Sequence, residues 1–207
     1  MRKAEARRRQ AGVAEFFSRK ISVTESCRNA IVSIVYKYKD WYLFKMKATF
    51  ESAKKLLDST KIIELLSRFG EVRVVGSYAF DLMTEPDIDL VVITDTPKES
   101  SEEALAYISK LHLFQKLEYG DFQKFPREKR PPFYILNMRT SHDDESWEIE
   151  AWFVPDARDK LQFVEMMKNI SSSQKQRILD LKRERKNAGI DKKRLSSYEI
   201  YRQVLGF

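Results

Sequence analysis

The stretch Gly76–Ile93, GSYAFDLMTEPDIDLVVI, decides the fold of this 207-residue chain. It ends in an apolar run that is typical of a buried strand, with Asp87 and Asp89 at its head. Residues two apart in a strand share a face, so both carboxylates point the same way while Ile88 and Leu90 face the core. Carboxylates beside an apolar core need a compensating cation or hydrogen bonds. The pair therefore predicts a site for a hard cation such as Mg²⁺.

A glycine and a serine precede the two aspartates, where a short β-branched strand gives way to about two turns of helix. Gly76 lets a ligand approach the backbone closely. Ser77 offers a hydroxyl and a backbone N–H at a helix start, where a phosphate is favoured. A phosphate cradle followed by metal-binding aspartates on the next strand indicates a metal–triphosphate site.

Acidic residues also interrupt a later apolar strand, SWEIEAWFV, at Ser146–Val154. Glu148, Glu150 and Trp152 share one face of that strand, and the residues between them take the other. A pair of metal ions held by two carboxylates is usually bound by a third carboxylate as well. Glu150, with apolar or aromatic neighbours on both sides, is the better candidate, and Glu148 is the reserve.

Helices and strands alternate along the chain, which predicts an α/β (α+β) fold with a small mixed sheet flanked by helices. A helical pattern from Glu51 ends at Gly70, and Leu117–Arg139 reads as two extended pieces around the polar turn PREKRPP. The expected strands are Val72–Gly76, Asp87–Thr94 and Ser146–Val154, and the expected C-terminal helices are Asp156–Ile170, Ser173–Asn187 and Ser196–Leu205. We expect an N-terminal helical segment (1–50), a core (51–155) and a C-terminal helical segment (156–207), folded as one compact unit.

The composition indicates in which compartment the protein works and which kinds of partner suit it. The single cysteine, Cys27, fits a reducing compartment, and no apolar run approaches the roughly 18 residues that span a bilayer. We therefore expect a cytoplasmic protein without a membrane partner. The net charge of +7 suits a polyanionic partner, but much of it lies in Arg2–Arg9 and Lys182–Arg194, which we interpret as solvated helix faces or tails.

Taken together, these motifs resemble a known family. Gly76–Ser77, nine residues, then Asp87–Asp89, within strand–helix–strand, is similar to the signature of the polymerase-β-like nucleotidyltransferase superfamily, and closest to its small, minimal members. The resemblance covers about Val72–Val154, including the later strand WEIEAWFV.

The resemblance implies a nucleotidyltransferase-like fold and a role for each matching residue. Ser77, with Gly76, would contact the triphosphate of a nucleoside triphosphate. Asp87 and Asp89 would hold divalent metals, Mg²⁺ or Mn²⁺, and Glu150 would be the third acid. The implied reaction transfers a nucleoside monophosphate to an acceptor hydroxyl by a two-metal mechanism and releases pyrophosphate. We expect a small-molecule or protein acceptor rather than RNA, and leave the oligomeric state open.

Two alternatives remain at this point. The family usually has an aspartate where this chain has Glu150, which favours a catalytically degenerate, nucleotide-binding module. The lysine–aromatic stretch Tyr36–Phe50 would suit a nucleic-acid-binding module instead.

Overall fold

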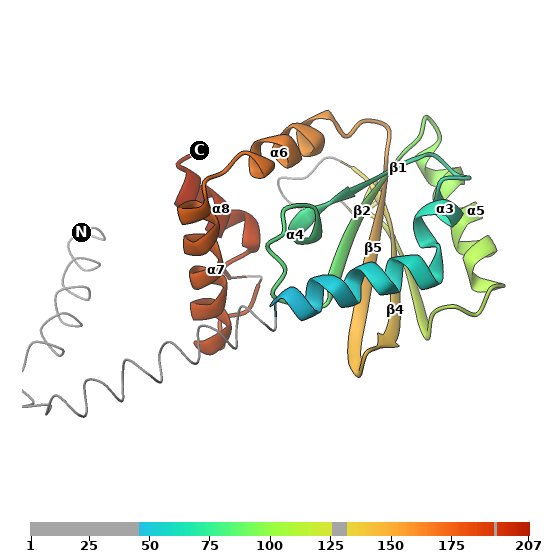
Figure 1. Ribbon diagram of the computed structural model, residues 1–207. Helices are drawn as coiled ribbons and strands as arrows, with labels where there is room; N and C mark the ends of the chain where they lie inside the picture. The colour runs from blue at the N-terminus through green and yellow to red at the C-terminus, as the bar shows by residue number, and fades with distance from the viewer. Residues whose placement is uncertain (1–45, 126–131, 193) are drawn as a thin grey trace, which may run out of the picture. The chain divides into compact units, whose positions relative to one another are not determined.

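The computed structural model describes residues 46–125, 132–192 and 194–207, which form a five-stranded mixed sheet with helices on both faces (Figure 1). The predicted mixed α/β fold is thereby confirmed. Most of the N-terminal helical segment expected over 1–50 lies outside the described residues, as does nearly all of the expected polar turn. No helix in the described ranges combines the length and apolarity needed to cross a bilayer.

The sheet has the strand order β1–β2–β5–β4–β3. Strand β1 (Glu71–Val75) pairs antiparallel with β2 (Asp87–Ile93), and β2 pairs parallel with β5 (Glu145–Val154). Strand β5 then pairs antiparallel with β4 (Tyr134–His142), and β4 with β3 (Lys116–Asp121). Because β2 and β5 are parallel, their acidic N-terminal halves lie side by side.

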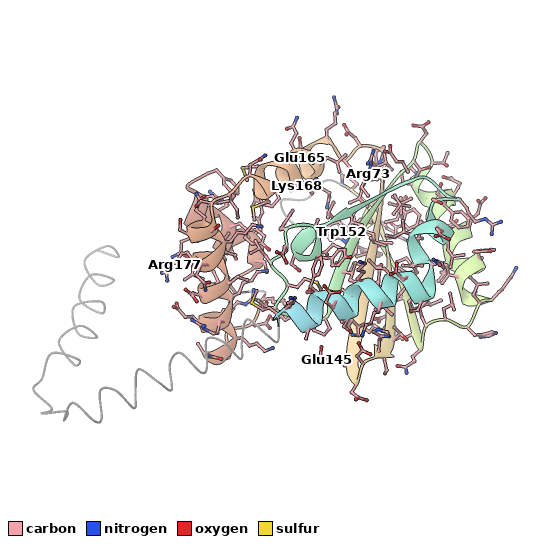
Figure 2. The ribbon with its side chains drawn as sticks, viewed as in Figure 1. Arg73, Glu145, Trp152, Glu165, Lys168 and Arg177 are labelled. Atoms are coloured by element: carbon pink, nitrogen blue, oxygen red, sulfur yellow. The ribbon has the colours of Figure 1, made fainter. Side chains whose placement is uncertain are left out.

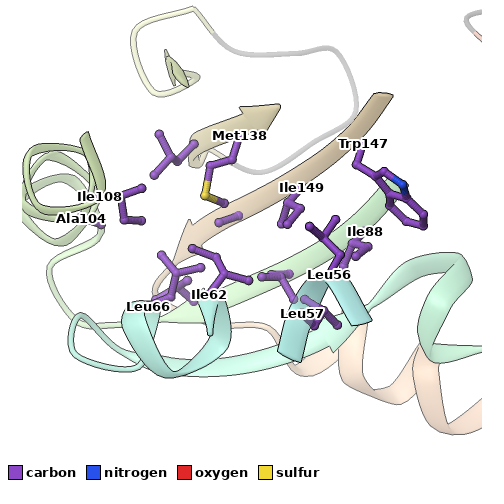
Figure 3. Close-up of a cluster of buried hydrophobic side chains, with 14 of the residues drawn as sticks. Leu56, Leu57, Ile62, Leu66, Ile88, Ala104, Ile108, Met138, Trp147 and Ile149 are labelled. Atoms are coloured by element: carbon purple, nitrogen blue, oxygen red, sulfur yellow. The ribbon is translucent and has the colours of Figure 1, made fainter. Parts of the chain in front are cut away.

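The first face of the sheet is covered by helical residues 46–60, α3 (Ile62–Leu66) and α5 (Pro97–Ser109) (Figure 1). Figure 3 shows side chains of these helices meeting those of the central strands in one buried cluster, among them Leu56, Ile62, Leu66, Ile88, Ala104, Ile108, Met138, Trp147 and Ile149. Burying each large apolar side chain contributes about 1.5–3 kcal/mol. This layer therefore anchors β2 and β5, the two strands that carry the candidate acids.

The second face is covered by α6 (Arg158–Lys168), α7 (Ser172–Asn187) and α8 (Ser197–Leu205). Their apolar side chains pack on the sheet in a second cluster, which includes Val75, Phe80, Val91, Ile135, Val154, Val164, Met167, Ile178 and Ile200. Val91 lies in this cluster, whereas Asp87 and Asp89 precede it on the same face of β2. The acids therefore lie at the margin of the second core.

Residues typical of helix ends are present at α7 and α8. Ser171 and Gln174 form a capping box at the start of α7, and Ser196 and Glu199 form another at the start of α8. Gly206, with φ of 80°, ends α8 in the left-handed conformation that glycine favours. These caps explain why the predicted and observed bounds of both helices agree within about two residues.

The helix predicted to run from Glu51 toward Gly70 is interrupted. Lys61 adopts a left-handed conformation, with φ of 51°, between helical residues 46–60 and α3. The hydroxyls of Ser59 and Thr60 donate to the carbonyl of Leu56 at 3.0 and 2.8 Å. Such local hydrogen bonds compete with a helix and often accompany its bending or end. The apolar spacing on both sides of the break still matches one buried face.

Candidate functional site

The sheet register brings four acidic side chains onto one face. Asp89 pairs in register with Glu150 on the adjacent parallel strand, and Asp87 pairs with Glu148. Asp87 and Asp89 alternate with the buried Ile88 on β2, as the sequence pattern predicted. Two neighbouring rows of the sheet therefore each hold two carboxylates.

Gly76 packs directly against the carboxylate of Asp89. The glycine follows β1 and starts α4 (Gly76–Ala79), with φ of +68°, a conformation that L side chains rarely adopt. A Cβ added at Gly76 would lie 2.0 Å from Oδ2 of Asp89. The absence of a side chain at this position therefore decides where the Asp89 carboxylate can lie.

Replacing Gly76 with alanine should both destabilise the protein and displace Asp89. The left-handed backbone costs an alanine about 1–2 kcal/mol, and the clash with the carboxylate adds to it. We expect the free energy of unfolding to fall by about 2 kcal/mol or more. Urea unfolding measures it, with Gly189→Ala as control, because Gly189 shares a positive φ of +62° but has open space around its Cβ position. Equal losses in the two variants would contradict a specific contact with Asp89.

The carboxyl group of Asp89 is hard to ionise. Burial, followed by repulsion from Asp87 and Glu150, raises the pKa of Asp89 to about 7, against the opposing effect of Lys160 and Lys192. Like charges held this close favour a cation between them or a shared proton. The field at Asp89 is therefore negative, although Lys160 and Lys192 reduce it.

The two candidates for the third acid have different surroundings. Glu148 accepts two hydrogen bonds from Arg139, at 2.9 and 3.1 Å, across the β4–β5 pair. Glu150 accepts a hydrogen bond from the indole N–H of Trp152 at 3.2 Å and lies opposite Asp89. Position and repulsion with Asp89 favour Glu150 over Glu148 as the third acid.

A lysine from the connection between α7 and α8 contacts the first aspartate. The ammonium of Lys192 lies 2.8 Å from Oδ2 of Asp87 and also pairs with Glu85. These carboxylates raise the pKa of Lys192 despite its partial burial. Burial alone would raise the pKa of Glu85, but the hydrogen bond and charge of Lys192, then the charge of Arg185, lower it. Sequence reasoning overlooked both Glu85 and Lys192.

Two cations of α7 are buried behind the loop that leads into β2. Lys182 is 3% exposed and donates to the carbonyl of Leu82 at 2.9 Å. Arg185, also 3% exposed, lies 3.2 Å from Glu85 and donates to the carbonyl of Leu195. Burial lowers the pKa of Lys182 to about 8, although the charge of Asp87 opposes the shift. The interpretation of Lys182–Arg194 as a solvated face or tail is wrong for Lys182 and Arg185.

Comparison with known proteins identifies the family to which the chain belongs. A model described as the nucleotidyltransferase domain matches residues 59–186, more than half of the chain. The chain belongs to this family. No curated protein matches it.

Two solved structures resemble the nucleotidyltransferase distantly. The first, from work on Cid1 and its RNA terminal uridylyl transferase activity, is 17% identical with a TM-score of 0.46, covering 72% of this chain and 46% of Cid1. The second, a GLD-2/RNP-8 complex, is 13% identical with a TM-score of 0.49, covering 82% of this chain and 61% of that one. The nucleotidyltransferase thus spans about half to three fifths of the length of these chains.

The acidic residues of the nucleotidyltransferase supply the type of ligand atom that a hard divalent cation prefers. Asp87, Asp89 and Glu150 offer only oxygen atoms, and burial together with repulsion from the other two acids raises the pKa of Asp89. Within the described residues, however, no three His, Cys, Asp or Glu side chains converge as a ready-made metal cluster. The acids are brought to one face, but their carboxylates are not yet gathered around one point.

The basic residues of α6 and α7 that could contact a phosphate have different surroundings. Lys160 lies near the acids, with its ammonium 3.8 Å from the centroid of the Trp152 ring. Arg158 is bound to Asp156, and Figure 2 shows Lys168 on α6, where it pairs with Glu165 at 2.7 Å. Lys175 is a half-buried residue of α7. Lys160 and the overlooked Lys192 are therefore the better phosphate candidates, since both contribute to the field at Asp89.

Proposed function

We propose that this nucleotidyltransferase transfers a nucleoside monophosphate from a nucleoside triphosphate to the hydroxyl of an acceptor. The acceptor oxygen bonds to the α-phosphorus, the bond from that phosphorus to the β-phosphate breaks, and pyrophosphate and the hydroxyl proton are released. One observation carries the proposal: Asp87, Asp89 and Glu150 share a face of the sheet, and Asp89 packs against a left-handed Gly76.

The residues at the end of β1 are proposed to hold the triphosphate. Gly76 leaves backbone accessible beside Asp89, and the hydroxyl of Ser77 makes no hydrogen bond to any other described residue. Lys160 and Lys192 would balance the negative charge of the phosphates from the second face. Together they position the α-phosphorus close to the acids.

Asp87, Asp89 and Glu150 are proposed to hold Mg²⁺ or Mn²⁺. When bound, two such ions would neutralise the pyrophosphate and lower the pKa of the attacking hydroxyl. The protein contributes the three carboxylates on a rigid pair of strands, whose opposite sides are buried in the first core. Rigidity matters here because misplacement by about 1 Å costs on the order of 100-fold in rate.

A pocket of about 400 Å³ beside Asp87 supports a small acceptor. Its walls come from the start of β2 and from β4, β5 and the α7–α8 connection: Glu85, Pro86, Asp87, Arg139, Ser146, Glu148 and Lys192. Pockets of about 300–1,000 Å³ suit small molecules. A small molecule, or the side chain of a protein, is therefore the acceptor we favour over RNA.

A second candidate function is nucleotide binding without turnover. Two contacts favour it: Lys192 already neutralises Asp87, and Glu150 is a longer acid held by the Trp152 indole. In that case the chain would sense a nucleotide rather than transfer it.

Pyrophosphate release from each of the four ribonucleoside triphosphates, with Mg²⁺, Mn²⁺ or a chelator, tests the proposal. A cytosolic extract serves as the source of acceptors. Metal-dependent release that requires Asp87 and Asp89 would support the transferase. Nucleotide binding without release would favour the second function, and neither binding nor release would refute both.

Replacing Ser77 with alanine should weaken nucleotide binding with little change in folding. The lost hydroxyl is one hydrogen bond to a charged group, so we expect the KM for the nucleotide to rise roughly 10-fold. Steady-state kinetics measures it, with Ser109→Ala, at the end of α5, as the matched control. An unchanged KM would remove Ser77 from the triphosphate site.

A further inference from the structure

Asn137 of β4 is polar and half-buried, and it lies in the same row of the sheet as two of the acids. In register, Asn137 pairs with Glu150, and Glu150 pairs with Asp89, so the three residues follow one another across three strands. Paired residues of adjacent strands point to the same face. The Asn137 amide therefore belongs to the acidic face of the sheet.

The amide oxygen of Asn137 is buried and has no hydrogen-bond partner among the described residues. Leaving a buried polar atom without a partner is unfavourable, and such atoms in native proteins call for an explanation. The neighbouring positions on this face of the strand pairs are Glu150 and Glu118, and carboxylates cannot donate a hydrogen bond to the amide oxygen when ionised. No described residue donates to this oxygen, so it offers an acceptor that a hydrogen-bond donor of a bound molecule can satisfy.

The position of Asn137 relative to the other site residues indicates which substrate would supply that donor. Gly76 follows β1, at one side of the acids, and Asn137 lies on β4, at the other, with β2 and β5 between them. At about 4.8 Å per strand, the two positions are roughly 14 Å apart. Arg139, two residues along β4 on the same face, already lines the pocket beside Asp87. Asn137 is therefore on the acceptor side of the site, away from the proposed triphosphate cradle.

We propose that Asn137 is part of the acceptor subsite, where its amide oxygen accepts a hydrogen bond from a hydroxyl of the acceptor. This inference rests on the proposed transferase function and deepens it. It assigns the acceptor as a polyhydroxylated molecule, with one hydroxyl at the acids and a second at Asn137. Glu118 pairs in register with Asn137, and Arg139 lies two residues along β4; both side chains are more than two fifths exposed, so they can move to admit the acceptor.

The test compares Asn137→Leu with wild type in melting temperature and in transfer kinetics. The probe is the low-molecular-weight fraction of a cytosolic extract, added at increasing amounts while pyrophosphate release is measured. We expect the variant to need roughly 10-fold more of this fraction for half-maximal release, with the KM for the nucleotide changed less than about twofold. Its melting temperature should stay level or rise by a few degrees, because an unsatisfied buried oxygen is removed. Asn187→Leu, on an exposed position of α7, serves as the control with wild-type behaviour in every measurement.

The outcomes separate the inference from the proposed function. A fall of several degrees in melting temperature would overturn the inference, since it would show that Asn137 supports the fold. An active wild type with the same half-saturating amount of extract fraction in both proteins would overturn the inference alone. A wild type that releases no pyrophosphate under any condition would remove the proposed function, and the inference with it.

Discussion

Asp87→Asn and Asp89→Asn should each reduce pyrophosphate release at least about 1,000-fold, equivalent to about 4 kcal/mol of transition-state stabilisation. Asparagine keeps the shape of the side chain but removes the negative charge that would hold a divalent cation. The two residues occupy different fixed positions on one face of β2. Neither carboxylate can therefore replace the other. Initial rates with Mg²⁺ and the best of the four nucleotides give the measurement.

Glu103→Gln, on an exposed position of α5, provides the matched control for this loss and should keep wild-type activity. Glu148 shares the strand face of Glu150 but is engaged by Arg139, so Glu148→Gln should lose much less activity than the aspartate variants. Glu150→Gln should lose nearly as much as the aspartate variants. If Glu148→Gln were the inactive variant and Glu150→Gln the active one, the assignment of the third acid would be reversed.

The second large effect has the opposite sign: Asp89→Asn should stabilise the metal-free protein at alkaline pH. The folded pKa of Asp89 is about 7, above its ordinary value of 3.8. Above pH 7 the folded protein therefore holds an ionised carboxylate at a cost on the order of 4 kcal/mol. This cost falls as pH drops through 7 and disappears below about pH 4, where the folded and unfolded states are both protonated. Urea unfolding with a chelator present should show a gain for the variant at pH 8 that exceeds its gain at pH 5 by about 2 kcal/mol.

Asp95→Asn is the control for this experiment, because Asp95 lies exposed just beyond β2. Its free energy of unfolding should change by less than about 0.5 kcal/mol at either pH. A variant that loses turnover yet gains stability is the expected signature of a residue selected for chemistry. Equal stability of Asp89→Asn and wild type at pH 8 would argue against a strained carboxylate.

The local elements of the site could be predicted because their signals are local. Alternation in DIDL identified which faces of β2 are buried, and the structure has Ile88 and Leu90 in the first core with both aspartates on the other face. The same period-2 pattern placed Glu148, Glu150 and Trp152 on one face of β5. The predicted starts of α7 and α8 lie within about one residue of the observed ones, where Ser171 and Ser196 cap the helices. In each case the physics acts over a few neighbouring residues.

By contrast, every contact between distant segments depended on the tertiary structure. The parallel pairing of β2 with β5 decides that Glu150, and not Glu148, lies opposite Asp89. Lys192 reaches Asp87 across 105 residues of sequence, and its tract looked like any solvated basic helix. Asn137 is linked to the site only by strand pairing, which places it next to Glu150. The sequence alone determined the elements and the faces that carry the carboxylates, since backbone periodicity is local. Only the tertiary structure decided which charges meet, because strand pairing and helix packing are set by the burial of the whole core.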